Sequence, residues 1–128
     1  MGQCVQQLLA IAGGGALGAV FRFGISSNIY RVFGRDFPYG TLTVNVLGSL
    51  LMGLFFALIF ERNVLSAEWR GVIMIGFLGA FTTFSTFSLE TLSLLESGEL
   101  TRAALNIFLS VALCLAATWL GLIIGRQL

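Results

Sequence analysis

Five hydroxyl side chains and three phenylalanines fill the eight residues from Phe81 to Ser88, which read FTTFSTFS. A hydroxyl donates a hydrogen bond, and the edge of an aromatic ring carries partial positive charge. Together these groups can surround a small anion without a fixed charge, which would hold the ion too tightly for it to move on. The segment therefore indicates weak, repeated binding of an anion.

The same segment is poorly suited to a regular helix. Gly76 and Gly79 precede it, and its clustered hydroxyls compete for backbone hydrogen bonds. We expect a break around residues 79–83, and the alternative is an unbroken helix whose hydroxyls bond back to preceding carbonyls. Within a membrane, a break must be buried in protein or line a cavity. There it frees carbonyls for a cation and aims a half-helix N-terminus at an anion.

This segment lies in one of four long apolar stretches. Of the 128 residues, 57% are hydrophobic and only 10% are charged, and the mean hydropathy is +0.95. A membrane-spanning helix needs ~20 mostly apolar residues. We therefore predict an all-α integral membrane protein, one membrane domain over residues 1–128, with spans at approximately 5–30, 40–60, 69–95 and 101–125. The first stretch is too long for a signal peptide and lacks its basic region, so we expect it to be retained.

The composition argues against several classes of protein. A net charge of +1 gives no indication of nucleic-acid binding. There is no histidine, and the two cysteines, Cys4 and Cys114, fit no zinc or redox motif. No nucleophile stands beside a base, so we predict that the protein is not an enzyme.

The arginines outside the predicted spans are evenly divided between the two sides of the membrane. They are Arg31, Arg35 and Arg102 on one side and Arg62, Arg70 and Arg126 on the other. An excess of Lys and Arg normally marks the cytoplasmic side. The balance here fits either a weakly biased single orientation or dual topology, in which copies insert both ways and pair antiparallel. Small residues at four-residue spacing, such as Gly14 and Gly18, suit helix packing within the chain or between two copies.

Polar residues also recur every four positions in two other spans. Thr41, Asn45 and Ser49 form such a stripe in the second span, and Asn106 and Ser110 do so in the fourth. Their hydroxyl and amide groups could bond neighbouring helices, at roughly 0.6 kcal/mol for each bond. We interpret Ser49 in this way, whereas for Asn45 packing and a role in an ion pathway remain equally open.

Two charged residues lie within or near the ends of spans. Arg22 could extend to the interface, pair with an acid such as Glu90, or attract an anion into a vestibule. Glu90 also keeps open an alternative function, a small proton-coupled multidrug exporter, which requires a carboxylate inside the membrane. A membrane scaffold without transport activity is the third hypothesis.

Three segments carry a resemblance to a known family. They are GxxGAFTTFSTFS in the third span, PYGTLTVN at residues 38–45, and GGGALGAVFRF, which contains Arg22. With them, the chain resembles the Fluc family of fluoride channels over essentially its full length. The resemblance implies an antiparallel, dual-topology homodimer with two pores in the lipid bilayer of the bacterial inner membrane. It also implies passive export of fluoride, driven by the membrane potential, which lowers fluoride toxicity in the cytoplasm.

The resemblance further assigns roles to residues of the pore. Ring edges facing fluoride would be those of Phe84 and Phe87, and Asn45 would be the pore asparagine. The remaining polar track would comprise Ser85, Thr86, Thr41 and, on the more variable fourth helix, Ser110.

Residues outside the pore also receive expected roles. Arg22 and Glu90 would lie in vestibules at the pore ends. A structural Na⁺ ion that is not transported would bind backbone carbonyls of Gly79 and Thr82 from both subunits.

Overall fold

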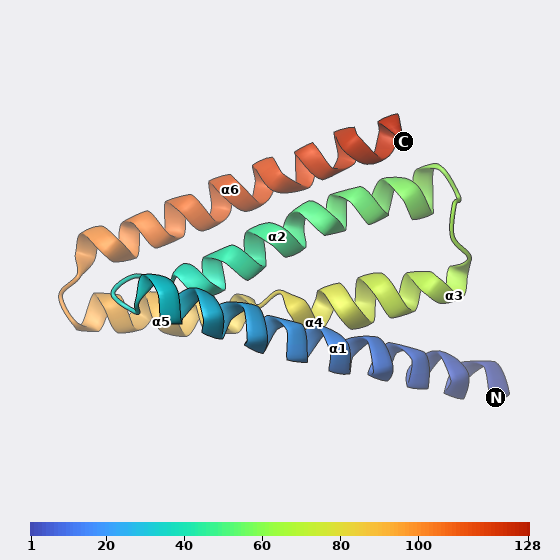
Figure 1. Ribbon diagram of the computed structural model, residues 1–128, viewed down its shortest axis with the longest axis horizontal. Coiled ribbons are helices and arrows are strands. Elements are labelled where there is room, and N and C mark those ends of the chain that lie inside the picture. The colour runs from blue at the N-terminus through green and yellow to red at the C-terminus, as the bar shows by residue number, and fades with distance from the viewer.

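The computed structural model describes all 128 residues, and every regular element in it is a helix (Figure 1). The elements are α1 (Gly2–Phe33), α2 (Tyr39–Phe56), η1 (Ala57–Glu61), α3 (Ala67–Arg70), η2 (Gly71–Leu78), α4 (Gly79–Phe81), α5 (Phe84–Glu96) and α6 (Leu100–Gln127). The two elements η1 and η2 have the wider turns of a π-helix. Four helices are long and apolar enough to cross a membrane, at Gly2–Phe33, Tyr39–Glu61, Ala67–Glu96 and Leu100–Gln127. The predicted all-helical fold with four spans is confirmed.

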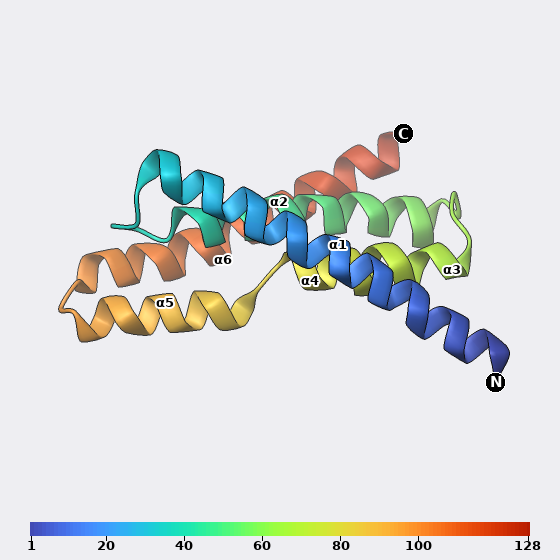
Figure 2. The same ribbon diagram turned by 60° about the horizontal axis from the view of Figure 1, so that its bottom comes forward.

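The third span is broken, as Figure 2 shows by the extended link between α4 and α5. Thr82 and Thr83 have extended backbones, with ψ angles of 157° and 115°. The predicted break is therefore confirmed, and the alternative of an unbroken helix is wrong. Gly79 is still helical, so the break begins only after Phe81 and occupies the last part of the expected range. The Thr83 hydroxyl then caps α5 by accepting the Thr86 N–H at 3.2 Å.

Glycines let α1 approach the first half of the broken span. A Cβ atom at Gly14 would collide with the carbonyl oxygen of Val72, and one at Gly18 would collide with that of Phe77. From the opposite side, a Cβ atom at Gly76 would lie 2.6 Å from the carbonyl oxygen of Ile11. These three glycines therefore serve packing within the chain, which was one of the two expected uses of the small residues.

Glycines also allow close contact between α2 and α6, which lie along each other in both views (Figures 1 and 2). A Cβ atom at Gly53 would collide with the Thr118 carbonyl oxygen, and one at Gly121 with that of Leu50. The helices therefore touch backbone to backbone, which makes the relative position of α2 and α6 intolerant of larger residues.

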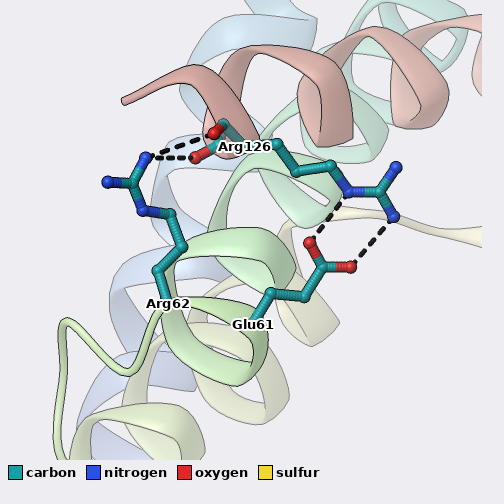
Figure 3. Close-up of polar contacts among 4 residues, drawn as sticks. Glu61, Arg62 and Arg126 are labelled. Atoms are coloured by element: carbon teal, nitrogen blue, oxygen red, sulfur yellow. Dashed lines mark hydrogen bonds and ion pairs between the residues drawn. The ribbon is translucent and has the colours of Figure 1, made fainter.

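Charged side chains join the ends of η1 and α6, close to the C-terminus (Figure 3). Arg126 donates two hydrogen bonds to the Glu61 carboxylate, at 2.8 and 2.9 Å. Arg62 donates to the carbonyl oxygens of Gly125 and Arg126, at 3.4 and 3.3 Å. Arg62 thus donates hydrogen bonds to carbonyl groups at the C-terminus of α6, which have no donor within their own helix.

Much apolar surface remains outside these contacts. Only 22 of the 128 residues are buried, and Phe108 and Trp119 on α6 are exposed over 67% and 65% of their surfaces. A surface this apolar requires lipid or another protein subunit to cover it.

We expect Gly18→Ala to destabilise the protein, because its new methyl group would meet the Phe77 backbone, which cannot rotate away. Overpacking of this kind typically costs about 1–3 kcal/mol. Thermal unfolding in detergent measures the effect, and Gly15→Ala is the matched control, because its methyl group would meet only the Gly76 oxygen, at 3.7 Å. Equal melting temperatures for the two variants would contradict this account of the α1 contact.

Candidate functional site

A pocket of about 420 Å³ brings the two expected pore phenylalanines together with polar groups of two other helices. Phe84 and Phe87 begin α5, with ring centroids 5.4 Å apart, and Asn45 of α2 and Ser110 of α6 line the same space. We call this space the phenylalanine pocket. Its lining contains no charged residue. Phe84 is 78% exposed, so one side of the pocket is open in the single chain.

Asn45 holds the break in the third span. Its side-chain oxygen accepts the Thr83 N–H at 2.7 Å, and its amide nitrogen donates to the Thr83 carbonyl at 3.0 Å. The Thr83 N–H would otherwise close a helical bond to the Gly79 carbonyl. Of the two options left open for Asn45, bonding between helices is therefore present in the structure. One of the two amide hydrogens is not used in this pair and remains available to a ligand.

Hydroxyls of the broken segment bond to one another and to backbone carbonyls. The Thr83 hydroxyl donates to that of Thr86 at 3.0 Å and lies 3.3 Å from that of Ser85. Thr82 bonds back to the Leu78 carbonyl at 3.0 Å. Ser85 is exposed, whereas Thr86 is partly buried and faces the hollows described next.

A second hollow, of about 520 Å³, is lined by Glu90, which lies in the middle of α5. Both oxygens of its carboxylate accept hydroxyl bonds, one from Thr41 and one from Tyr30 at 2.6 Å. Thr41 and Thr86, two of the expected track residues, line this hollow with Arg35. We call it the Glu90 vestibule. It contains hydrogen-bond donors and charges of both signs, in contrast to the phenylalanine pocket.

Arg22 lines a smaller hollow of about 200 Å³ together with Thr41, Thr83 and Thr86. Because Thr41 and Thr86 also line the Glu90 vestibule, polar surface continues between the two hollows. The suggested ion pair between Arg22 and Glu90 is wrong, since the only ion pairs are Arg102–Glu99 and Arg126–Glu61. Glu90 has hydroxyl partners instead.

A buried polar chain connects α6 to α5 beside the phenylalanine pocket. Ser110 donates to the Asn106 side-chain oxygen at 3.3 Å, and Asn106 donates to the Thr91 hydroxyl at 2.8 Å. Thr91 in turn donates to the Phe87 carbonyl at 2.7 Å. The chain holds Ser110 and Phe87 at fixed relative positions within the apolar interior.

Of the expected carbonyl ligands for sodium, Gly79 is the first residue of α4 and Thr82 lies in the break. Gly79 is exposed and Thr82 partly so. The Gly79 carbonyl lacks its usual helical donor, because the Thr83 N–H turns to Asn45. No group of three or more His, Cys, Asp or Glu side chains is placed to hold a metal ion.

Sequence analysis missed Tyr30 and Thr91 among the residues that shape these hollows. Tyr30 was detectable, because it follows Arg22 and Ser26 at four-residue spacing on α1, the same periodicity that identified the stripe on α2. Thr91 follows Phe87 by one turn, but nothing in the sequence pairs it with Asn106 on another helix.

The fold and the hollows define a small multi-pass membrane protein with a polar, largely uncharged site at a broken helix. Sequence comparison is more specific. The chain belongs to the CrcB family, described as "CrcB-like protein, Camphor Resistance (CrcB)", which matches residues 9–122.

Curated relatives of similar length match almost from end to end. A protein of Coxiella burnetii is 54% identical over 122 residues, covering 94% of this chain and 98% of the relative. One of Geobacter sulfurreducens is 51% identical over 121 residues, with the same coverage of both chains. A Methylococcus capsulatus relative is 57% identical over 121 residues, and the chain spans about half, 53%, of its length. All three relatives are described as "Fluoride-specific ion channel FluC". The family resemblance drawn from the motifs is confirmed.

We expect Asn45→Ala to loosen the break, because it leaves both backbone groups of Thr83 without partners inside the protein. An unsatisfied buried polar group costs about 1–3 kcal/mol. Hydrogen–deuterium exchange of the peptide containing Thr83 should become faster. Ser49→Ala is the control, since Ser49 lies one turn further along α2, lines the same pocket and makes no hydrogen bond through its side chain. Unchanged exchange in Asn45→Ala would remove Asn45 from this role.

Proposed function

We propose that this protein is a fluoride-specific ion channel through which fluoride leaves the cytoplasm passively, so that its toxicity falls. Membership of the CrcB family and relatives of 51–57% identity that are described as fluoride channels support this function. The structural observation that carries it is the phenylalanine pocket. Two phenylalanine rings, the Asn45 amide and several hydroxyl-bearing residues line it, and no charged group does.

Fluoride gives up tightly held water when it enters such a pocket, and hydrogen-bond donors must replace that water. In this proposal, Asn45 supplies its unused amide hydrogen, and Ser110 supplies its hydroxyl proton by releasing the Asn106 side-chain oxygen. The positive ring edges of Phe84 and Phe87 supply weaker electrostatic contacts. Since no fixed positive charge traps the ion, it can move on to Ser85, Thr86 and Thr41 in the polar track. Arg22 and Glu90 stand in the hollows beyond, as vestibule residues.

The channel in this proposal is an antiparallel homodimer with two pores in the bacterial inner membrane. The open side of the phenylalanine pocket supports a second subunit, because Phe84 is 78% exposed and needs a protein wall to exclude lipid from an ion. The equal division of six arginines between the two sides supports insertion in both orientations.

A structural sodium ion at the twofold axis belongs to the same proposal. The carbonyl oxygens of Gly79 and Thr82 from each subunit would bind it, in the way that unwound membrane helices bind cations. The exposure of Gly79 and the missing helical donor at its carbonyl support this placement. The ion would join the two breaks and would not be carried.

Two observations argue against a proton-coupled multidrug exporter. The relatives are described as fluoride channels, and the hydroxyls of Tyr30 and Thr41 engage both oxygens of Glu90, the carboxylate that such an exporter would need free.

Liposomes that contain the purified protein should lose a fluoride gradient and keep a chloride gradient. The double variant Phe84→Ile, Phe87→Ile should conduct fluoride at least about tenfold more slowly, equivalent to ~1.4 kcal/mol in the barrier. The control is Phe108→Ile, because Phe108 is exposed on α6 and does not line the pocket. Equal release of both ions by the unaltered protein would end the claim of selectivity. Full activity of the double variant would contradict the role of the Phe84 and Phe87 rings in fluoride conduction.

Dual topology predicts that copies of the protein face both ways in one membrane. Both termini lie at the same end of the molecule, so one tag on either terminus reports orientation (Figure 1). In sealed vesicles, a protease should remove about half of the tags from outside and the rest only after detergent is added. Removal of all or none before detergent would contradict the antiparallel dimer.

A further inference from the structure

Tyr30 connects α1 to the carboxylate of Glu90 on α5. Its hydroxyl donates to Glu90 Oε2 at 2.6 Å, while the Thr41 hydroxyl donates to Oε1 of the same carboxylate. The Tyr30 oxygen also accepts the Thr41 N–H at 3.4 Å and lies 3.2 Å from the Thr41 hydroxyl oxygen. Three helices thus meet at one carboxylate.

The ring of Tyr30 is held by contacts that do not involve its hydroxyl. On one side, the Arg35 guanidinium carbon lies 4.6 Å from the ring centroid. On another side the ring packs against Gly40, where a Cβ atom would collide with ring carbons and lie 2.7 Å from the Ser26 carbonyl oxygen. Gly40 therefore provides the space that lets this ring reach Glu90. Arg35 is the only charged residue besides Glu90 that lines the vestibule.

The number of hydroxyl protons limits how many hydrogen bonds Tyr30 and Thr41 can donate. Thr41 and Tyr30 each have one hydroxyl proton, and both protons are directed at Glu90. An anion passing Thr41 must take the Thr41 proton away from Glu90. If Tyr30 still donates, the carboxylate keeps one hydrogen bond during that exchange. Without the Tyr30 hydroxyl, the partly buried carboxylate would lose its remaining donor, so it would retain the Thr41 proton more strongly.

We propose that Tyr30 is a positioning residue of the ion pathway: by satisfying Glu90, its hydroxyl releases the Thr41 hydroxyl to bind fluoride. This inference rests on the proposed fluoride conduction and adds a residue on α1 to it. Tyr30 acts through Glu90 and Thr41 and need not touch the ion.

Tyr30→Phe removes the hydroxyl and keeps the ring between Arg35 and Gly40. Fluoride release from liposomes should slow by about tenfold, the size expected for one hydrogen bond to a charged group. Tyr39→Phe is the matched control, because Tyr39 is the only other tyrosine and its hydroxyl makes no hydrogen bond in the chain. If the unaltered protein releases no fluoride, the proposed function fails. If it does and Tyr30→Phe matches Tyr39→Phe, only the role of Tyr30 fails.

A double-mutant comparison separates positioning from general loss of structure. Glu90→Gln removes the charge that retains the Thr41 proton, so adding Tyr30→Phe to it should slow release by no more than about twofold. An undiminished effect of Tyr30→Phe in that background would overturn the inference.

Infrared difference spectroscopy tests the same inference without measuring transport. Addition of fluoride to the unaltered protein should shift a carboxylate stretching band that Glu90→Gln lacks, because Thr41 leaves the carboxylate. The shift should be lost in Tyr30→Phe and kept in Tyr39→Phe. Absence of a shift in the unaltered protein, or its persistence in Tyr30→Phe, would overturn the assignment of Tyr30.

Discussion

A backbone that leaves helical geometry inside a membrane must have its N–H and carbonyl groups bonded within the protein, because lipid offers no partner. At Thr83 this requirement is met by one side chain, Asn45, which bonds both backbone groups. The position of the break therefore depends on α2. In turn, the first two turns of α5 depend on the break for their direction, and these turns bear Phe84, Phe87 and the hydroxyls between them.

Close helix packing fixes the distance between Asn45 and Thr83. Asn45 can reach Thr83 only if α2 and the third span are held within hydrogen-bonding distance along their length. Glycines on both faces of the bundle allow backbone contact, from α1 onto η2 and from α2 onto α6. Through the buried chain from Ser110 to the Phe87 carbonyl, α6 then orients the same part of α5. Three helices thus position the phenylalanine pocket, although no charged group takes part.

Charged side chains are kept out of the phenylalanine pocket. The phenylalanine pocket has no charged lining residue, whereas Arg22 and Glu90 stand in the neighbouring hollows, joined by the shared residues Thr41 and Thr86. The two hollows that hold charged side chains adjoin each other, and the phenylalanine pocket remains uncharged. Glu90 is bonded to two hydroxyls and not to Arg22. An ion pair would neutralise both charges, while two hydroxyl donors satisfy a carboxylate and can still be exchanged.

The sequence by itself determined the elements and their chemistry. Apolar stretches of sufficient length specify four spans, because a helix must be long enough to cross the lipid. Gly76, Gly79 and the clustered hydroxyls after them predicted a break around residues 79–83, and the structure confines it to Thr82 and Thr83. The four-residue stripe on α2 also identified Thr41 and Asn45 correctly as polar residues on one face. These features are local, so periodicity and composition reveal them.

Only the tertiary structure decided which polar groups meet. Asn45 bonds to a backbone 38 residues away and Tyr30 to a carboxylate 60 residues away, and no local pattern encodes either pairing. The same limit applies to the glycines, whose spacing is compatible with contacts inside the chain or between chains until the neighbouring backbone is placed. The physical reason is that a hydrogen bond or a close backbone contact depends on the register and crossing of two helices. These are set by the packing of the whole bundle and not by either helix alone.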